Sequence, residues 1–341
     1  MEKQAAIGRQ PAIEVEHLQV QFKTESGYVT TVEDVSFSVR AGETLCIVGE
    51  SGSGKSVTSL AIMGLLDAGG RVSGGQVRIL GEDVVRYSRR QWDRVRGKDI
   101  AMIFQEPMSA LNPAYTIGNQ LIEQIVKHRK WPRSRAEQHA VELLAQVGIS
   151  RPKEILKEYP HQLSGGMRQR VMIAMALSCE PKILIADEPT TALDVTIQAQ
   201  ILSLLKEMQE KYGLAIILIT HDMGVVSEMA DRVLVMYAGQ VVEESDVFTL
   251  FEQHRHPYTK GLMECIPHLD LDPSEWLQVI PGTVPSFTDM PEGCRFQSRC
   301  PFVRDICRRQ DPGLTALDGG HRVRCWMVRE PELFRKEGDP T

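Results

Sequence analysis

The stretch TLCIVGESGSGKS, residues 44–56, decides the fold. It begins with a short, nearly all-apolar run, which is typical of a central parallel strand buried on both faces. GESGSGKS at 49–56 then fits the pattern G-x-x-x-x-G-K-[ST], and KSVTSLAIMGLL continues with the apolar spacing of a helix. A glycine loop between a strand and a helix is a common phosphate-binding arrangement. The sequence therefore predicts a nucleoside triphosphate site.

We expect the residues of this loop to have different roles in binding the nucleotide. Gly49, Gly52 and Gly54 let the backbone curl so that successive N–H groups point at phosphate oxygens. Lys55 is expected to reach the β- and γ-phosphates, and the hydroxyl of Ser56 to ligate Mg²⁺. The remaining residues that we expect to contact the nucleotide here are Ser51, Ser53 and Val57.

Strand and helix patterns alternate along the rest of the chain. The strand candidates are 12–22, 32–40, 99–105, 183–188 and 215–222, and the helical stretches are 55–66, 116–158 and 195–211. This alternation predicts an α/β fold with a parallel sheet and a helical insertion. Near residue 245 the character changes, because the remainder is rich in Pro, Cys and Arg. We expect a small, loop-rich region there that needs an extra staple.

A second acidic element follows the loop at ILIADE, residues 183–188. Its strand delivers Asp187 and Glu188 to the carboxyl end, where parallel sheets bind ligands. We expect Asp187 to hold Mg²⁺ through water and Glu188 to act as the general base on the attacking water.

LSGGMRQR at 163–170 predicts a second anion site, formed by Ser164, Gly165 and Gly166 at the start of a helix. Two anion sites in one chain are redundant unless the second serves the nucleotide of another subunit. The motif therefore favours an assembly of two such chains.

Bulk properties narrow the class further. The chain has 341 residues, 42% of them hydrophobic, which is enough for about two domains. Its net charge of −6 disfavours a dedicated nucleic-acid binder, and the basic run 86–98 is expected to be a solvated face. MEKQAAIGRQP has no apolar signal region, and apolar stretches such as 214–219 are strand-sized. We therefore expect a soluble, cytoplasmic chain.

With these motifs in view, the chain resembles the ATPase subunit of an ATP-binding cassette (ABC) transporter over residues 12–245. Six elements occur in the family's order: the phosphate loop, Gln105 in IFQEPMS, LSGGM, ILIADE, ALD at 192–194 with Asp194, and His221 in ITHD. The resemblance implies a RecA-like, mostly parallel sheet, N-terminal antiparallel strands and a helical subdomain at about 106–178. A separate C-terminal region would cover 246–341.

The resemblance also implies roles. In that family two cassettes pair head to tail, and each ATP lies between the phosphate loop of one and the signature of the other. His221 would touch the γ-phosphate, and Gln105 would link the metal and the water to the helical insertion. Phe22 is expected to stack on adenine. Two alternatives stay open: Tyr28 stacks on adenine instead, or Phe22 is simply a core residue.

The segments EPMSALNPAYTIGNQ, YPHQLSGGM and HPYTKGL…IPGTVPS resemble the dipeptide/oligopeptide permease branch of importers. This implies an ATP-hydrolysing subunit docked on two integral-membrane permease subunits at the cytoplasmic face of the bacterial inner membrane. An external binding protein would deliver the peptide, and the second cassette would be a homologous chain, giving a heterodimer. A homodimer, a nickel or other small-solute importer, and a non-transport cassette ATPase stay open. No nucleic-acid partner is expected.

The same branch implies a [4Fe–4S] cluster on Cys294, Cys300, Cys307 and Cys325. The residues themselves allow several states, since four thiolates suit zinc or an iron–sulfur cluster. The tight C-x₂₋₄-C pairs of structural zinc sites are missing, and Cys300-Pro301 is similar to the end of ferredoxin-type runs. Zinc and free thiols remain the alternatives. We expect a structural staple, with redox sensing also open.

Overall fold

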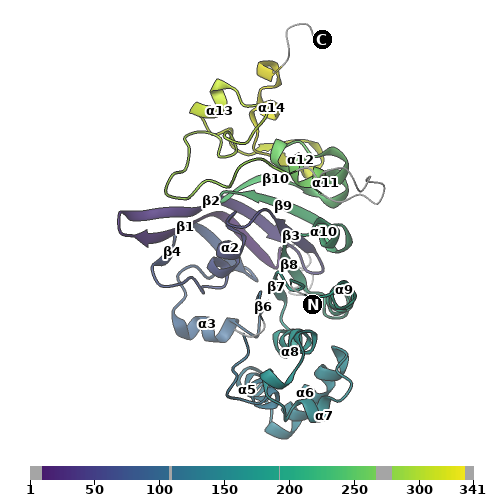
Figure 1. Ribbon diagram of the computed structural model, residues 1–341. Helices are drawn as coiled ribbons and strands as arrows, with labels where there is room; N and C mark the ends of the chain where they lie inside the picture. Colours follow the sequence, from purple (N-terminus) through teal and green to yellow (C-terminus); the bar gives the residue numbers. More distant parts are fainter. Residues whose placement is uncertain (1–9, 107–109, 192, 266–278, 335–341) are drawn as a thin grey trace.

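The computed structural model describes residues 10–106, 110–191, 193–265 and 279–334. Its main sheet has eight strands in the order β11-β12-β10-β9-β3-β8-β7-β6 (Figure 1). The stretch from β9 to β6 is parallel, and β10, β12 and β11 are antiparallel additions. The strands are β3 Thr44–Val48, β6 Ile100–Ile103, β7 Ile183–Asp187, β8 Ala215–Thr220, β9 Arg232–Tyr237, β10 Gln240–Asp246, β11 Thr315–Ala316 and β12 Arg322–Val323. The predicted α/β fold with a mostly parallel sheet is confirmed.

The central strands explain why the sequence reads as it does. Every residue of β3, β7 and β8 is buried, because both faces of this part of the sheet are covered. Parallel neighbours end at the same edge of a sheet, so the residues that follow them come out together. The phosphate loop follows β3, Glu188 follows β7 and His221 follows β8.

A second, antiparallel sheet has the order β2-β1-β4-β5. Its strands are β1 Ile13–Thr24, β2 Gly27–Val39, β4 Gly70–Ile79 and β5 Glu82–Asp83. Ile13 pairs with both Val39 and Ile79, and the apolar face of these strands packs on Ile47 and Ile62 of the main core. The predicted strand at 12–22 is confirmed. Alternation did not reveal β4, since glycines interrupt its apolar positions.

Most helices cover the main sheet or form the insertion. They are α2 Lys55–Ile62, α3 Arg89–Val95, α5 Ile117–Arg129, α6 Arg133–Gln146, α7 Pro152–Ile155, α8 Gly165–Leu177, α9 Val195–Tyr212 and α10 Met223–Met229, with a 3₁₀ turn at Pro160–Gln162. Figure 1 shows α5 to α8 together at the lower end of the molecule, beyond β6. The predicted helix at 55–66 is too long: α2 ends at Ile62, and Gly64 then turns the chain with φ 61°.

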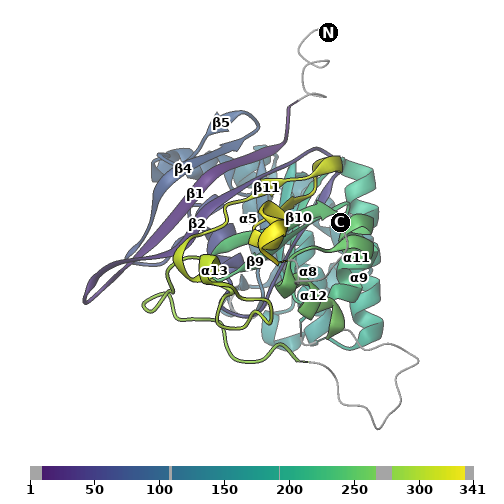
Figure 2. The same ribbon diagram turned by 90° about the horizontal axis from the view of Figure 1, so that it is seen from above.

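The chain after residue 246 forms α11 Val247–Gln253, α12 Pro257–Glu264, α13 Asp305–Arg309 and α14 Trp326–Arg329, with 3₁₀ turns at Asp318–Gly320 and Pro331–Phe334. Figure 1 shows these elements on the β10 side of the sheet, opposite the α5–α8 group, and Figure 2 shows α11, α12 and α13 around β10 from above. Strand β12 pairs with β10 through Glu243 and Val323. Backbone pairing thus joins this region to the main sheet across the predicted boundary at 245.

A buried carboxylate fixes the same region. Glu243 of β10 is fully buried, and its oxygens accept hydrogen bonds from the backbone N–H groups of Arg255 (2.6 Å) and His256 (3.0 Å). The Nε2 atom of His321 lies 2.8 Å from the same carboxylate. Burial acts to raise the pKa of Glu243, but these hydrogen bonds, with His321 the strongest, hold it below its ordinary value. These hydrogen bonds attach the C-terminal region to β10.

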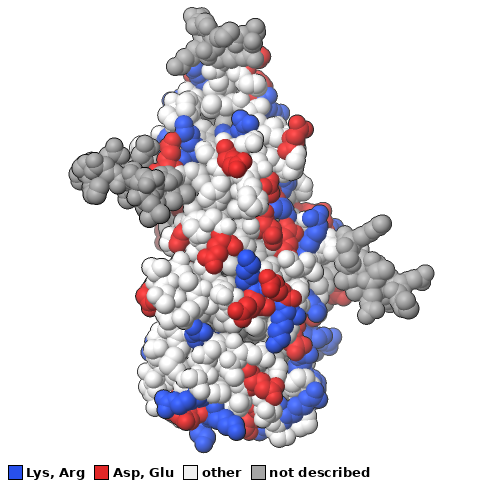
Figure 3. All heavy atoms as spheres, turned by 90° about the vertical axis from the view of Figure 1, so that its right-hand side faces the viewer, with Lys and Arg blue, Asp and Glu red and all other residues white. Residues whose placement is uncertain are grey.

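The surface of the molecule carries charges of both signs (Figure 3). Acidic and basic side chains are interspersed on the face drawn in Figure 3, in keeping with the small net charge of −6. Among the residues that the structure describes, no helix combines the length and apolarity needed to cross a membrane.

Candidate active site

The phosphate loop lies between β3 and α2, as predicted. Gly49, Gly52 and Gly54 have φ values of 151°, 79° and 99°, which L side chains rarely adopt. At Gly49 a Cβ atom would lie 2.2 Å from the carbonyl oxygen of Met236. Ser51 and Gly52 are exposed at the tip, Ser53 is buried, and Val57 is half-buried on α2. Glycine is therefore required by conformation, and at Gly49 also by space.

Lys55 folds back over this loop. Its Nζ atom donates to the carbonyl oxygens of Gly49 (2.6 Å) and Glu50 (2.9 Å) and to the hydroxyl of Ser53 (3.4 Å). Burial lowers the pKa of Lys55, and the charges of Glu188, Asp187 and Glu50 oppose that effect. The ammonium group is thus held above the loop, where phosphate oxygens can replace its carbonyl partners.

Asp187 and Ser56 form the predicted metal-binding pair. Asp187 ends β7, and its Oδ1 atom is buried without a hydrogen-bond partner among the described residues. Burial raises the pKa of Asp187, whereas a hydrogen bond with the Ser56 hydroxyl lowers it. An unpaired buried carboxylate oxygen beside a hydroxyl fits the oxygen ligands that Mg²⁺ prefers. The residues present therefore suit the cation expected with ATP.

The predicted catalytic residues meet at Glu188. Its Oε2 atom accepts hydrogen bonds from Gln105 Nε2 and Thr191 Oγ1, both at 2.9 Å, and its Oε1 lies 3.2 Å from His221 Nδ1. Burial acts to raise the pKa of Glu188, but the hydrogen bonds from His221, Thr191 and Gln105 outweigh it and hold the pKa below the ordinary value. Thr191 was not predicted; only its place three residues after Glu188 could have suggested it.

The signature residues lie in another part of the molecule. Ser164 caps the 13-residue helix α8, with its hydroxyl 3.4 Å from the N–H of Met167. Ser164 and Gly165 are exposed, and the first turn of α8 carries no acidic residue. Figure 1 places α8 with the insertion, away from α2. This exposed helix start can accept an anion that comes from outside the chain.

Asp194 and Phe22 have mainly structural contacts within this chain. Asp194 caps α9, and its carboxylate accepts from the N–H of Ile197 at 3.0 Å; Ala192 lies outside the described residues. Phe22 is half-buried opposite Gly70, where a Cβ atom would lie 2.8 Å from its ring. Tyr28 is 49% exposed, and the guanidinium of Arg71 lies 3.7 Å from its ring centroid. Phe22 and Tyr28 both stay predictions for the ring that stacks on adenine.

All four predicted cluster cysteines line one cavity, together with His256, Phe296 and Trp326. Its volume is about 20 Å³, room for about one water molecule. Within the described residues, no group of three or more Cys, His, Asp or Glu side chains is arranged to hold a metal ion. Burial raises the pKa of Cys294 to about 12 and that of Cys325 to about 11. The predicted four-iron cluster is therefore not supported by the arrangement of these side chains.

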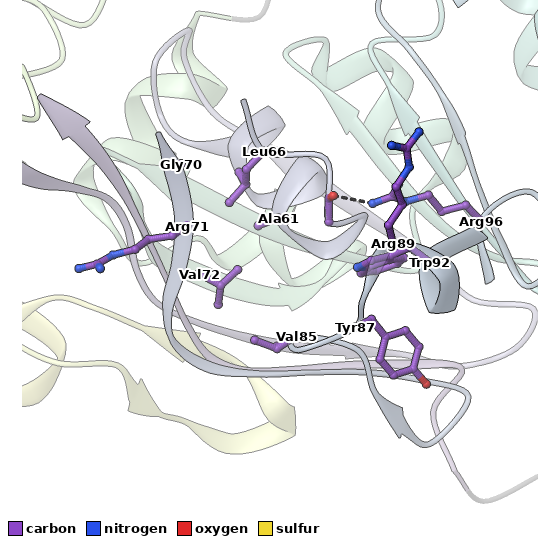
Figure 4. Close-up of a pocket in the computed structure, with 11 residues that line it drawn as sticks. Ala61, Leu66, Gly70, Arg71, Val72, Val85, Tyr87, Arg89, Trp92 and Arg96 are labelled. Atoms are coloured by element: carbon purple, nitrogen blue, oxygen red, sulfur yellow. Dashed lines mark hydrogen bonds between the residues drawn. The ribbon is translucent and has the colours of Figure 1, made fainter. Parts of the chain in front are cut away.

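Other cavities lie away from the cysteine cluster. A cavity of about 580 Å³ lies beyond the C-terminal end of α2, lined by residues that include Leu66, Arg71, Val85 and Trp92 (Figure 4). None of the predicted site residues lines it. A cavity of about 310 Å³ opens beside the phosphate loop instead, lined by Gly49, Glu50 and His221 and by Leu262 and Ile280 of the C-terminal region.

The chain is similar to known proteins over most of its length. Residues 32–191 match the family model for ABC transporters, and residues 242–307 match that for the oligopeptide/dipeptide transporter C-terminal region. The oligopeptide transport ATP-binding protein AppD of Bacillus subtilis is 50% identical, over 93% of this chain and 97% of its own length. The dipeptide transport ATP-binding protein DppD of Escherichia coli is 51% identical, over 92% and 95%.

Solved structures show the same fold. The ATP-binding cassette MJ0796, in a dimeric post-hydrolysis state bound to ADP and Pi, is 27% identical, with a TM-score of 0.62 over 69% of this chain and 98% of that one. CbiO1 from Clostridium perfringens, part of an ABC transporter complex, is 29% identical, with a TM-score of 0.61 over 72% and 93%.

Proposed function

Because the chain belongs to the ABC transporter family, in its branch of oligopeptide and dipeptide ATP-binding proteins, we propose a mechanism for it as the ATPase subunit of a peptide importer. ATP and Mg²⁺ are its expected substrate and cofactor, and membrane permease subunits and a second ATPase subunit its partners. The observation that carries the mechanism is the convergence of Gln105, Thr191 and His221 on Glu188. Glu188 follows β7 at the carboxyl edge of the parallel sheet, the same edge at which the phosphate loop follows β3.

In this mechanism the loop amides and Lys55 bind the β- and γ-phosphates. Ser56 and Asp187 would hold Mg²⁺, which neutralises phosphate charge when bound. Glu188, ionised at neutral pH because its pKa is held low, takes a proton from the attacking water. The water oxygen bonds to the γ-phosphorus as the bond to ADP breaks, giving ADP and phosphate. Gln105 and His221 keep the carboxylate in position.

The second anion site requires a second subunit. The exposed start of α8 would bind the γ-phosphate held by an opposing cassette, through Ser164, Gly165 and Gly166, with Asp194 near the same interface. The dimeric state of MJ0796 with ADP and Pi supports this assignment. We favour a homologous second chain, giving a heterodimer; a homodimer is the alternative.

The cargo assignment comes from the branch. The match of residues 242–307 to the oligopeptide/dipeptide C-terminal region favours peptides over nickel or another small solute. The ATPase region 12–245 would dock through its helical part, about 106–178, on two permease subunits at the cytoplasmic face of the bacterial inner membrane. The region 246–341 would stay peripheral. An external binding protein would deliver the peptide.

Glu188→Gln tests the catalytic assignment. Loss of the general base should slow phosphate release by roughly 10²–10⁴-fold while ATP binding persists. The bound ATP should then hold the two cassettes together as a stable dimer in gel filtration. Glu123→Gln, an exposed change on α5, is the control. A Glu188→Gln chain that hydrolyses ATP at the normal rate would remove this residue from its role.

We also propose that the four cavity cysteines bind a metal, because four soft donors face one enclosed space. A [4Fe–4S] cluster would need more space than the cavity of about 20 Å³ offers, and a single zinc ion would need less. Metal analysis of anaerobically purified protein separates the cases: brown protein with about four irons, colourless protein with one zinc, or neither. Cys265→Ser, outside the cavity, should leave the metal content unchanged, and Cys307→Ser should lower it. Protein without metal contradicts the proposal.

A further inference from the structure

The second residue of the phosphate loop, Glu50, is held by the C-terminal region. Its carboxylate accepts two hydrogen bonds from one guanidinium, from Arg299 Nη1 at 2.6 Å and Nη2 at 3.0 Å. Its backbone N–H donates to the hydroxyl of Tyr258 at 2.8 Å, and its carbonyl accepts from Lys55. Glu50 therefore connects the phosphate-binding lysine to residues more than 200 positions later in the chain.

Arg299 is a fixed support. Its side chain is 3% exposed, whereas that of Glu50 is 33% exposed. The guanidinium also donates to the carbonyl oxygens of Pro281 (2.7 Å) and Ile280 (3.1 Å), and it lies beside the ring of Tyr237. A paired, planar guanidinium with this many partners has one orientation, so it defines where Glu50 can lie.

A second arginine supports the other end of the loop. Arg295 donates to the carbonyl oxygen of Ala238 and pairs with Glu33. The next residue, Gly239, donates its N–H to the carbonyl oxygen of Ser53 at 2.9 Å. The β9–β10 turn, at Ala238 and Gly239, thus contacts Arg295 on one side and the buried Ser53 of the phosphate loop on the other.

Both arginines belong to one short segment of the cysteine cavity. Arg295 follows Cys294, and Arg299 precedes Cys300. Within the segment Gln297 donates its N–H to Cys294 and Arg299 to Phe296, while the N–H of Cys294 donates to Cys307 at 2.8 Å. The side chains that reach the loop and the thiols that line the cavity are therefore parts of the same folded turn.

From this geometry we propose that Arg299 and Arg295 are positioning residues for the phosphate loop, through which the C-terminal region sets the affinity of the chain for Mg·ATP. The proposal depends on the ATPase function given above. The loop binds phosphate with backbone N–H groups, and these must be held in one arrangement to bind tightly. Arg299 supplies that restraint at Glu50, and Arg295 supplies it at Ser53.

Arg299→Gln is the direct test in the full chain. A charged hydrogen bond removed from a buried site costs on the order of tenfold or more, and here the loss should appear as a weaker Kd and a higher KM for Mg·ATP. The kcat should change less than about twofold, because the residues around Glu188 are untouched. Arg309→Gln, at a residue 77% exposed in the same region, is the matched control.

A substitution at Glu50, which pairs with Arg299, provides a second test if Arg299→Gln fails to fold. Glu50→Gln removes the same pair from the exposed side and should raise KM by a similar factor. The double variant should have a KM for Mg·ATP no higher than that of the single variant with the higher KM. Each single change already removes the one interaction that the two residues share. Arg299→Lys, which keeps the charge but not the paired geometry, should fall between wild type and Arg299→Gln.

Two results would overturn the proposal. Unchanged affinity for Mg·ATP in Arg299→Gln and Glu50→Gln, with only a lower melting temperature, would make the pair a stabilising contact and nothing more. Additive losses in the double variant would show that the two residues act separately. Wild-type protein that does not bind Mg·ATP would instead contradict the ATPase function itself, so the two failures can be told apart.

Discussion

Glu188 combines a strained backbone with a fully engaged side chain. Its φ is 47°, in the left-handed region that non-glycine residues rarely occupy. Its N–H is held by the carbonyl oxygen of Ile219 at 2.9 Å, and three side chains hold its carboxylate. Such a conformation costs about 1–3 kcal/mol and persists where the surroundings determine it. With the backbone in this left-handed conformation, the carboxylate lies within hydrogen-bonding distance of Gln105 and His221.

Gly49 shows how strictly single positions of the loop are determined. Gly49→Ala would place a methyl group 2.2 Å from the carbonyl oxygen of Met236, at a φ of 151°. We expect at least a tenfold loss of Mg·ATP affinity in calorimetric titration, because the start of the loop must shift by more than a side-chain adjustment. The unfolding free energy should fall by about 1–3 kcal/mol.

Gly42→Ala separates the two causes. Gly42 also has a positive φ, 76°, but a Cβ atom there would meet nothing within 4 Å. This control should lose stability through strain alone and bind Mg·ATP normally. Normal affinity in Gly49→Ala would show that the loop tolerates the displacement.

At the scale of elements, the central strands and the residues at their ends could be predicted from the sequence. β3, β7 and β8 are continuous apolar runs, and their carboxyl ends carry the loop, Glu188 and His221. The antiparallel β9–β10 pair was not predicted: β9 is largely apolar, but β10 reads QVVEESD, and its polar residues show no strand alternation although they are buried. The contact of Glu50 with Arg299 could not be predicted, because it spans 249 positions and no local pattern marks it.

α12 begins with a buried histidine, and this makes the attachment of the C-terminal region sensitive to pH. Burial lowers the pKa of His256 to about 4, against the opposing effects of the Glu243 charge and of a hydrogen bond to the backbone of Arg324, and its Nδ1 accepts from the N–H of Tyr258. In the unfolded chain His256 takes up a proton near pH 6.5, whereas in the folded chain it stays neutral until the pH is much lower. The stability due to neutral His256 is complete above pH 6.5 and is lost as the pH falls toward 4.

Urea unfolding at pH 7.5 and 5.0 measures this contribution. Wild-type protein should lose about 2 kcal/mol more on acidification than His256→Asn, whose amide oxygen can still cap α12. His161→Gln, at an exposed histidine, should behave like wild type. Equal pH dependence in wild type and His256→Asn would mean that His256 is charged in the folded chain.

At the scale of the whole molecule, the residues of the two proposed half-sites lie in different parts of the fold (Figure 1). The phosphate loop, Asp187 and Glu188 lie at the carboxyl edge of the sheet, and the start of α8 lies on the helical insertion. The C-terminal region supports the first half-site through Glu50, and the insertion carries the second. Motion between these parts would therefore change both sites of a dimer together.

The shared site can be tested by photocrosslinking from position 164. A photoreactive residue replaces Ser164 in a tagged chain that also carries Lys55→Ala, so this chain cannot hold ATP on its own loop. Assembled with a wild-type second cassette, the tagged chain should still be labelled by radioactive ATP, because the nucleotide comes from the opposing subunit. A probe at Arg309, which is exposed but far along the chain from α8, should not be labelled. If labelling at 164 disappears with Lys55→Ala in the same chain, the two half-sites belong to one subunit and the head-to-tail arrangement is wrong.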